Sequence, residues 1–264
     1  MSLVFSAIAP HPPILVPTLG RKHAPALRQT RQSYDYLAQE LYAAHPDVLV
    51  IITPHGTVVP STWQVLIDDK LSGNLNEFSD FATSVTVSGS TAFSHRFKER
   101  AEANGFNVLL QSDRPLDYGC IIPLLNLVKP LPKLRVMPLI VSDQDLASHS
   151  AVGQMLREEI FSTNERVAVV ASADLSHRLT KQSPGGYQRS AKAFDQQIVR
   201  ALEHGDPSAI INQSAEAIEA AMACGLRPIS VLLGAWYRRS FRCLTLAYEY
   251  PFGVGYLTAL MVPD

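Results

Sequence analysis

The chain has 264 residues, of which 18% are charged and 47% are hydrophobic, and its formal net charge is -1. This composition excludes a disordered chain, because disordered chains combine low hydrophobicity with high net charge. It also argues against a protein that binds nucleic acid or anionic membranes, since the sequence has no block of Lys or Arg. The 3 Cys form no CxxC pair, so the sequence predicts neither a disulfide framework nor a zinc ribbon.

Signals for membrane insertion or export are absent from the sequence. No apolar run approaches the roughly 18 residues that span a bilayer. The first residues, Met-Ser-Leu-Val-Phe-Ser, lack the basic segment that opens a signal peptide. We therefore expect a soluble, cytoplasmic protein. Since no stretch resembles an interdomain linker, we also expect a single domain over residues 1–264.

Short apolar runs alternate with longer helical patterns along the chain, which predicts an α/β fold with three α/β/α layers around a mixed, largely parallel central sheet. Continuous apolar runs indicate buried strands, and apolar residues that recur every three or four positions indicate helices. In chain order, the expected elements are a strand at Leu3–Ala9, a helix at Arg21–His45, a strand at Val48–Thr53, two strands of a peripheral ribbon at Thr62–Ile67 and Thr83–Ser88, helices at Ser90–Asn104 and Tyr118–Val128, a strand at Arg135–Val141, a helix at Gln144–Phe161, a strand at Arg166–Ser172, a helix at Gly186–His204, two short helical pieces within Pro207–Ala223, a helix at Arg227–Tyr237, and strands at Arg242–Tyr248 and Val254–Val262.

A histidine follows each of three predicted buried strands. His11 comes after the first strand, His55 after the second, and His177 after the strand at Arg166–Ser172. Ligands of open α/β sheets bind at the carboxyl ends of the strands. A single His at such a place is more often a surface or capping residue, but three together favour a functional site. His11 and His55, on strand ends that could be neighbours, suit a metal such as Fe, Zn, Cu or Mn.

A metal centre needs a third ligand, and the residues alone leave four candidates open. Cys224 precedes Gly225 in a tight loop that could present a thiolate, although a lone Cys is usually a small buried hydrophobe. Glu216 and Glu219 are expected on a helix, where Glu usually faces solvent. Glu249 lies between two tyrosines at a strand end and could be a buried structural carboxylate.

Other chemistries find no support in the sequence. It contains no G-x-x-x-x-G-K-[ST], no G-x-S-x-G and no H-E-x-x-H, the motifs of phosphate-binding loops, serine hydrolases and zinc proteases. A metal-dependent hydrolase is a third possibility, since bound zinc with an open position activates water. The polar residues that could line a pocket, such as Tyr118, Arg178 and Arg227, do not identify a substrate.

Five motifs occur in an order that resembles a known family. They are Ala9–Pro17, Thr53–Gly56, Asp117–Gly119 with Pro123–Leu124, Ser172–His177 and Pro251–Tyr256. Together they resemble the class III (LigB-like) extradiol ring-cleavage dioxygenase superfamily, and most closely its Memo-like (AmmeMemoRadiSam) branch, over essentially the whole chain. The resemblance implies an oxidoreductase that uses Fe(II) and O2 to cleave a small aromatic diol or aminophenol. A small partner subunit is common in that superfamily, and the near-zero net charge of this chain would permit a homo-oligomer.

The resemblance assigns roles to individual residues. His11 and His55 would bind the metal, and His177 would act as the acid–base catalyst that takes a phenolic proton and later returns one. Asp174 would orient His177 or its loop, or would cap a helix. The extradiol enzymes use a glutamate as the third ligand, and similar relatives carry Glu-Cys at the positions of Ala223-Cys224, whereas Memo proteins place a Cys there. The resemblance therefore favours Cys224 as the third ligand.

Two of these positions differ from the ring-cleaving members. A Cys224 thiolate is softer than a carboxylate and extends the metal choice from Fe(II) to Zn or Cu. Tyr118 stands where those enzymes often carry a histidine, and its hydroxyl can form hydrogen bonds but cannot replace an imidazolium. Both differences motivate an alternative function: a Memo-like metal-binding protein without dioxygenase activity, acting in metal handling or as a partner in a modification system.

Overall fold

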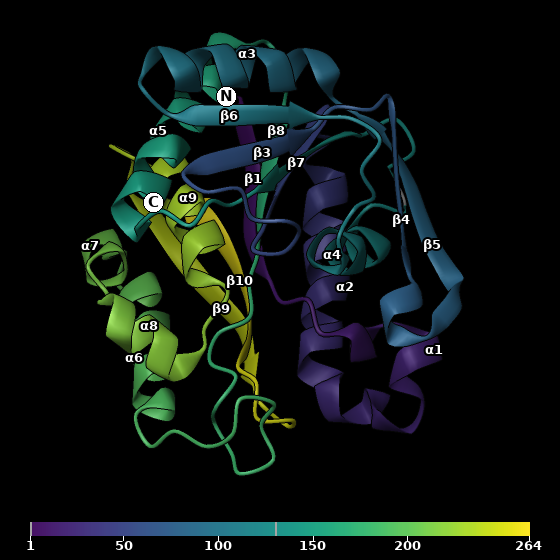
Figure 1. Cartoon of the computed structure of the whole chain (residues 1–264), viewed down its shortest axis with the longest axis vertical. Helices are drawn as coiled ribbons and strands as arrows, with labels where there is room; N and C mark the ends of the chain where they lie inside the picture. The colour runs from purple at the N-terminus through teal and green to yellow at the C-terminus, as the bar shows by residue number, and fades with distance from the viewer. Residues whose placement is uncertain (1, 130) are drawn as a thin grey trace.

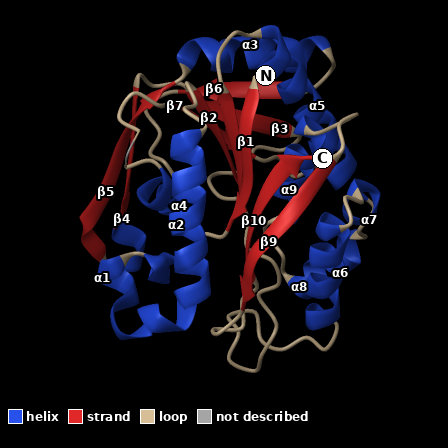
Figure 2. Ribbon diagram, turned by 180° about the vertical axis from the view of Figure 1, so that it is seen from behind, coloured by secondary structure: helices blue, strands red, loops and turns tan. Residues whose placement is uncertain are grey.

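The computed structural model describes residues 2–129 and 131–264, whose strands form one ten-stranded mixed sheet. Helices α2 and α4 cover one face of this sheet, and α5, α6 and α9 cover the other (Figures 1 and 2). This arrangement confirms the predicted α/β/α layers. The strands are β1 (Leu3–Ala9), β2 (Val48–Thr53), β3 (Thr62–Leu66), β4 (Lys70–Leu75), β5 (Asp80–Gly89), β6 (Asn107–Gln111), β7 (Arg135–Ile140), β8 (Val167–Ser172), β9 (Phe241–Glu249) and β10 (Tyr256–Pro263). The α-helices are α1 (Pro17–Gly20), α2 (Arg28–Ala43), α3 (Thr91–Ala103), α4 (Tyr118–Leu127), α5 (Leu146–Ser162), α6 (Ala191–Glu203), α7 (Pro207–Ile211), α8 (Ala215–Ala221) and α9 (Leu226–Ala235), and the 3-10 helices are η1 (Pro13–Leu15), η2 (Arg21–Leu27) and η3 (Asn76–Phe78).

Four neighbouring strands at the centre of the sheet run parallel, in the order β7-β2-β8-β1. Their carboxyl ends therefore share one edge, as the sequence predicts for the histidine-bearing loops. The strand β8 lies between β1 and β2, so these two strands are not direct neighbours. The register places Ala9 of β1 beside Ser172 of β8, which brings the loops after all three strands together.

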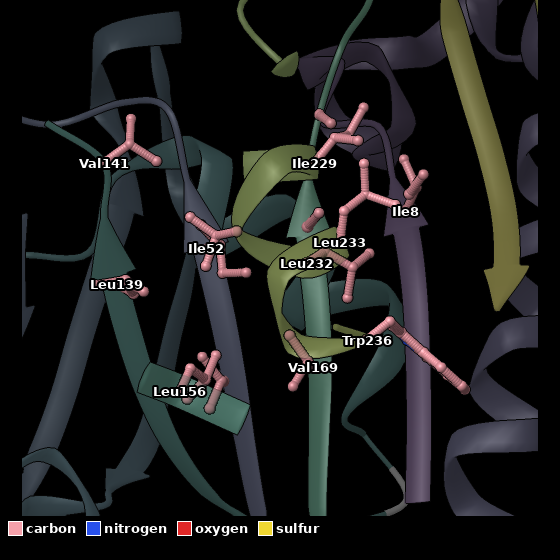
Figure 3. Packing of buried hydrophobic residues seen from close by; sticks show 14 of the residues in the cluster. Ile8, Ile52, Leu139, Val141, Leu156, Val169, Ile229, Leu232, Leu233 and Trp236 are labelled. Carbon is pink, nitrogen blue, oxygen red and sulfur yellow. The ribbon is translucent and has the colours of Figure 1, made fainter. Parts of the chain in front are cut away.

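The central strands are apolar throughout because both of their faces are covered. In β2, alternate residues Val48, Val50 and Ile52 join the core on the α5 and α9 side. Leu49 and Ile51 join the separate core on the α2 and α4 side. Figure 3 shows side chains of α9, among them Ile229 and Leu232, lying over the first of these faces, which carries Ile52. Burial on both faces explains why continuous apolar runs predicted these strands correctly.

Two predicted helices begin later than expected. The pattern placed one helix at Arg21–His45, but the first seven residues form the 3-10 helix η2, and α2 begins at Arg28. Pro25 explains the difference, because proline lacks the N–H of an α-helical hydrogen bond and its ring clashes with the preceding turn. Similarly, α6 begins at Ala191 and not at Gly186, whose φ is 76°. Within the described residues, no helix is both long and apolar enough to cross a membrane.

The peripheral strands pair differently from the prediction. The predicted ribbon joined Thr62–Ile67 to Thr83–Ser88, whereas β3 pairs with β6 and β7, and β5 pairs with β4 and β7. The strands β4 and β6 were not predicted at all. In β4 the buried positions alternate with exposed ones, but one of the buried positions is Gly73. Ser, Gly and Asn fill the middle of β4 and are typical of turns, so the alternation of its two leucines carries little signal.

Candidate metal centre

Three side chains converge at the carboxyl edge of the sheet. Nε2 of His11 lies 2.9 Å from Nε2 of His55, and Sγ of Cys224 lies 3.7 Å from Nε2 of His11. Their donor atoms all fall within 4.8 Å of one another, and no other such group of His, Cys, Asp or Glu occurs in residues 2–129 and 131–264. Two nitrogen ligands about 2.1 Å from one ion, at right angles, would lie about 3 Å apart. The cluster could therefore hold a metal ion.

The other candidates for the third ligand lie elsewhere. Glu249 accepts hydrogen bonds from the backbone N–H and the hydroxyl of Thr30, at 2.8 and 2.6 Å, beside the first turn of α2. Glu216 and Glu219 are exposed on α8. Of the four candidates, the structure brings only Cys224 to the two histidines.

The hydrogen bonds of Ser172 determine which nitrogen of His11 carries its proton. The Ser172 hydroxyl donates to the carbonyl oxygen of Gly119 at 2.5 Å, so it accepts from Nδ1–H of His11 at 2.8 Å. The Nε2 lone pair of His11 then faces the cluster. Burial, and next the charge of His177, lowers the pKa of His11 to about 3. Burial, then His11 and His177, lowers the pKa of His55 to about 3 as well, and neutral imidazoles are the form that binds metals.

Replacing Ser172 with alanine is expected to weaken metal binding about 10–100-fold, the usual effect of removing an outer hydrogen bond to a metal-binding His. The variant leaves Nδ1–H of His11 without its acceptor. Ser6→Ala is the matched control, because the buried hydroxyl of Ser6 in β1 has no hydrogen-bond partner in the described part of the chain. Competition with a chelating dye measures both affinities, and equal affinities would contradict the role of Ser172.

A network around Asp117 holds His55 in place. Asp117 caps α4 by accepting from the backbone N–H of Cys120 at 3.2 Å, and it also accepts from the Thr53 hydroxyl at 2.7 Å. The capped helix begins at Tyr118, whose ring stacks on His55 with 4.2 Å between ring centroids. A Cβ atom on Gly119 would lie only 2.5 Å from Oγ1 of Thr53, so this close packing requires glycine.

Asp174 and His177 occupy one short loop after β8. The Asp174 carboxylate accepts from the backbone N–H of His11 at 2.9 Å, and its other oxygen is 3.7 Å from Nε2 of His11. Burial raises the pKa of Asp174 to about 6. Asp174 therefore holds His11 and does not cap a helix. His177 instead donates Nδ1–H to the carbonyl oxygen of Leu175 at 3.1 Å, so Nε2 is the ring nitrogen left to exchange a proton with a ligand.

Cys224 lies in the turn between α8 and α9. Its thiol donates to the carbonyl oxygen of Asp174 at 3.6 Å, and burial, followed by the charge of Asp174, raises the pKa of the thiol. A Cβ atom on Gly225 would lie 2.7 Å from both the Ala173 Cβ and the Asp174 carbonyl oxygen, so the turn approaches the loop after β8 as closely as a glycine permits. The thiol is protonated in the metal-free state, and a bound metal would displace the proton.

Two other polar residues that the sequence offered for a pocket donate hydrogen bonds to backbone carbonyl oxygens. Arg178 donates to the carbonyl oxygen of Ala220 at 3.3 Å, and exposed Arg227 donates to that of Asp143 at 3.4 Å. The sequence prediction missed Asp195, a buried carboxylate on α6. Its place in the middle of an ordinary amphipathic helix gave no signal.

The buried Asp195 carboxyl is expected to make stability depend on pH. It is 0% exposed, and burial raises its pKa to about 6, whereas in the unfolded chain it ionises near pH ~4. Between about pH 4 and pH 6 the folded state binds more protons, so the free energy of unfolding falls as pH rises, by up to about 2–3 kcal/mol. Asp195→Asn has no titrating carboxyl at this position, so it lacks this decrease in the free energy of unfolding. In urea unfolding from pH 4 to 7, the free energy of unfolding of the variant should rise relative to that of the wild type as the pH increases. Parallel curves for the two proteins would contradict the assignment.

Comparisons with known proteins identify relatives over nearly the whole chain. A family model described as the catalytic LigB subunit of aromatic ring-opening dioxygenase matches residues 6–259. Protein CA_C1420 of Clostridium acetobutylicum is 27% identical over 265 residues, which cover 97% of this chain and 57% of that protein. The chain thus spans little more than half the length of that relative. The crystal structure of the uncharacterized protein JW3007 from Escherichia coli K12 has the same fold, with a TM-score of 0.70 and 16% identity over 98% of this chain and 99% of that one.

Proposed function

Because the chain belongs to the LigB family of aromatic ring-opening dioxygenase subunits, we propose that it is a metal-dependent dioxygenase of the extradiol type. The substrate would be a small aromatic diol or aminophenol, and both atoms of O2 would enter the ring-opened product, so no separate reductant is needed. The observation that carries the proposal is the convergence of His11, His55 and Cys224 at the edge of the sheet.

The proposed metal is Fe(II), held by His11, His55 and Cys224. Their fit rests on two facing imidazole nitrogens, one of them directed by Ser172, and on a thiol within reach of both. When bound, ferrous iron would supply the redox chemistry that lets O2 react with an aromatic diol. The thiol also suits Zn or Cu, so metal selectivity is part of the test.

The chain's own residues would move protons and orient the substrate. In its neutral form His177 would accept a phenolic proton at Nε2 and later return it, since Nδ1–H is held by the Leu175 carbonyl oxygen. The position of His177 near the centre is supported by its effect on the pKa of His11 and His55. Burial raises the pKa of Tyr118, so its hydroxyl stays neutral and can donate a hydrogen bond to a substrate oxygen.

Two observations support a second candidate function, a Memo-like metal-binding protein without dioxygenase activity. Cys224 supplies a thiol where ring cleavage uses a carboxylate. Tyr118 lies directly on His55, at 4.2 Å, where an imidazole could otherwise assist the reaction. Such a protein would handle metal or serve as one component of a modification system, with a partner subunit or a second copy as its assembly.

Anaerobic loading with Fe(II), followed by air and a panel of catechols and aminophenols, separates the two functions. Dioxygenase activity predicts that O2 uptake equals the amount of ring-opened chromophore formed. Stoichiometric iron without O2 uptake on any substrate would overturn ring cleavage and favour the second candidate. Parallel loading with Zn and Cu shows which metal the site prefers.

A further inference from the structure

Asp195 on α6 is a buried carboxylate outside the metal cluster. Its Oδ1 accepts from the backbone N–H of Ser176 at 3.0 Å, and its Oδ2 accepts from the Tyr248 hydroxyl at 2.8 Å. No cation pairs with it in residues 2–129 and 131–264. Burying a carboxylate without a counter-ion is unfavourable, and its hydrogen bonds offset only part of that cost. A group buried at such cost is a candidate for a role in the nearby site.

Ser176 belongs to the base loop, defined here as residues 174–177, which carries Asp174 and His177. The base loop is bonded to the thiol loop, residues 221–225, which carries Cys224. The Ser176 hydroxyl and the His177 backbone N–H both donate to the carbonyl oxygen of Ala221, at 2.8 and 3.0 Å. The Cys224 thiol donates back to the base loop at 3.6 Å. Hydrogen bonds therefore join the two loops, and Asp195 of α6 bonds to the base loop.

Close packing around Asp195 also fixes the base loop from the β10 side. The backbone N–H of Gly255 donates to the Ser176 carbonyl oxygen at 2.8 Å, and the Gly255 carbonyl oxygen accepts from Leu175 at 2.8 Å. A Cβ atom on Gly255 would lie 2.2 Å from Oδ2 of Asp195. The carboxylate is thus held against the backbone of Gly255, which is hydrogen-bonded to the base loop, with no space for a side chain between them.

We propose that Asp195, supported by Tyr248, is a positioning residue of the metal centre. Through Ser176 it sets where the base loop lies, and through the base loop it sets the distance of Cys224 from the histidines. The inference rests on the proposed function for the roles of His177 and Cys224. A purely structural carboxylate would affect the stability of the whole protein, whereas a positioning residue has a selective effect on the thiol loop.

The reactivity of Cys224 in metal-free protein tests this inference directly. Cys120 and Cys243 are buried and Cys224 is partly exposed, so iodoacetamide followed by peptide mass mapping resolves the three thiols. In Asp195→Ala the base loop loses a charge-assisted hydrogen bond, and we expect alkylation of Cys224 to accelerate about tenfold, with Cys120 and Cys243 unchanged. Asp195→Asn keeps an acceptor oxygen for Ser176 and should restore a rate near that of the wild type.

Glu159→Gln is the control for general destabilisation. Glu159 is also a buried carboxylate, 2% exposed, but its partners are Arg96 and Arg100 of α3. If Asp195→Ala leaves the Cys224 rate unchanged, or accelerates all three thiols together, the inference is overturned. Tyr248→Phe provides a milder variant under the same criteria if Asp195→Ala does not fold. Because the protein is metal-free, this result is independent of whether iron binds or any catechol is cleaved.

Discussion

His11→Ala is expected to lower the affinity for Fe(II) by about 10²–10³-fold and to abolish O2 uptake with any aromatic diol. The estimate follows from structural metal sites, where about 10–16 kcal/mol of binding energy is shared among four ligands. His11 is 1% exposed, its Nε2 is 2.9 Å from Nε2 of His55, and its backbone is held by Asp174. Anaerobic dialysis followed by elemental analysis measures the bound iron.

The control for this variant is His204→Ala. His204 caps the C-terminus of α6, where its Nδ1–H donates to the carbonyl oxygen of Arg200. It should retain wild-type iron content. Bound iron that is equal in His11→Ala and in the wild type would place the metal elsewhere.

His177→Ala is expected to keep its iron and to lose turnover by about 10²–10⁴-fold, the usual contribution of a general acid–base group. The loss follows because nothing else in the base loop offers a free imidazole lone pair, while the three proposed ligands are untouched. Steady-state O2 uptake at saturating substrate measures turnover, and elemental analysis of the same sample confirms that the metal remains.

Together, His11→Ala and His177→Ala separate metal binding from proton transfer. If His177→Ala loses iron together with activity, His177 belongs to the metal sphere and not to proton transfer. If it retains the turnover of the wild type, another group moves the proton. Tyr118→Phe removes only the neighbouring hydroxyl and shows whether that hydroxyl contributes to turnover.

The parts of the fold that follow from local sequence were predictable. Val48–Thr53 and Arg166–Ser172 read as strands because they are buried on both faces, and each places a histidine at the common edge. The order of these strands was not predictable, because pairing joins segments far apart in the chain. Only the sheet reveals β8 between β1 and β2, and with it the contact of Ser172 with His11.

The candidate site was predictable where residue type and position agree. His11 and His55 combine a metal-binding side chain with a strand end, so their meeting could be expected. The third ligand required tertiary structure, since Cys224 and three glutamates were equally compatible with the residues alone. The role of Asp195 could not be predicted, because it accepts a hydrogen bond from the backbone N–H of Ser176, which lies outside α6. A backbone donor has no residue-type signature in the sequence.

X-ray absorption at the metal edge of the iron-loaded protein would identify the ligands of the proposed centre. We expect one iron per chain, with a sulfur scatterer that disappears in Cys224→Ala and imidazole scattering that decreases in His55→Ala. A shell of nitrogen and oxygen alone, unchanged in both variants, would contradict a centre formed by His11, His55 and Cys224.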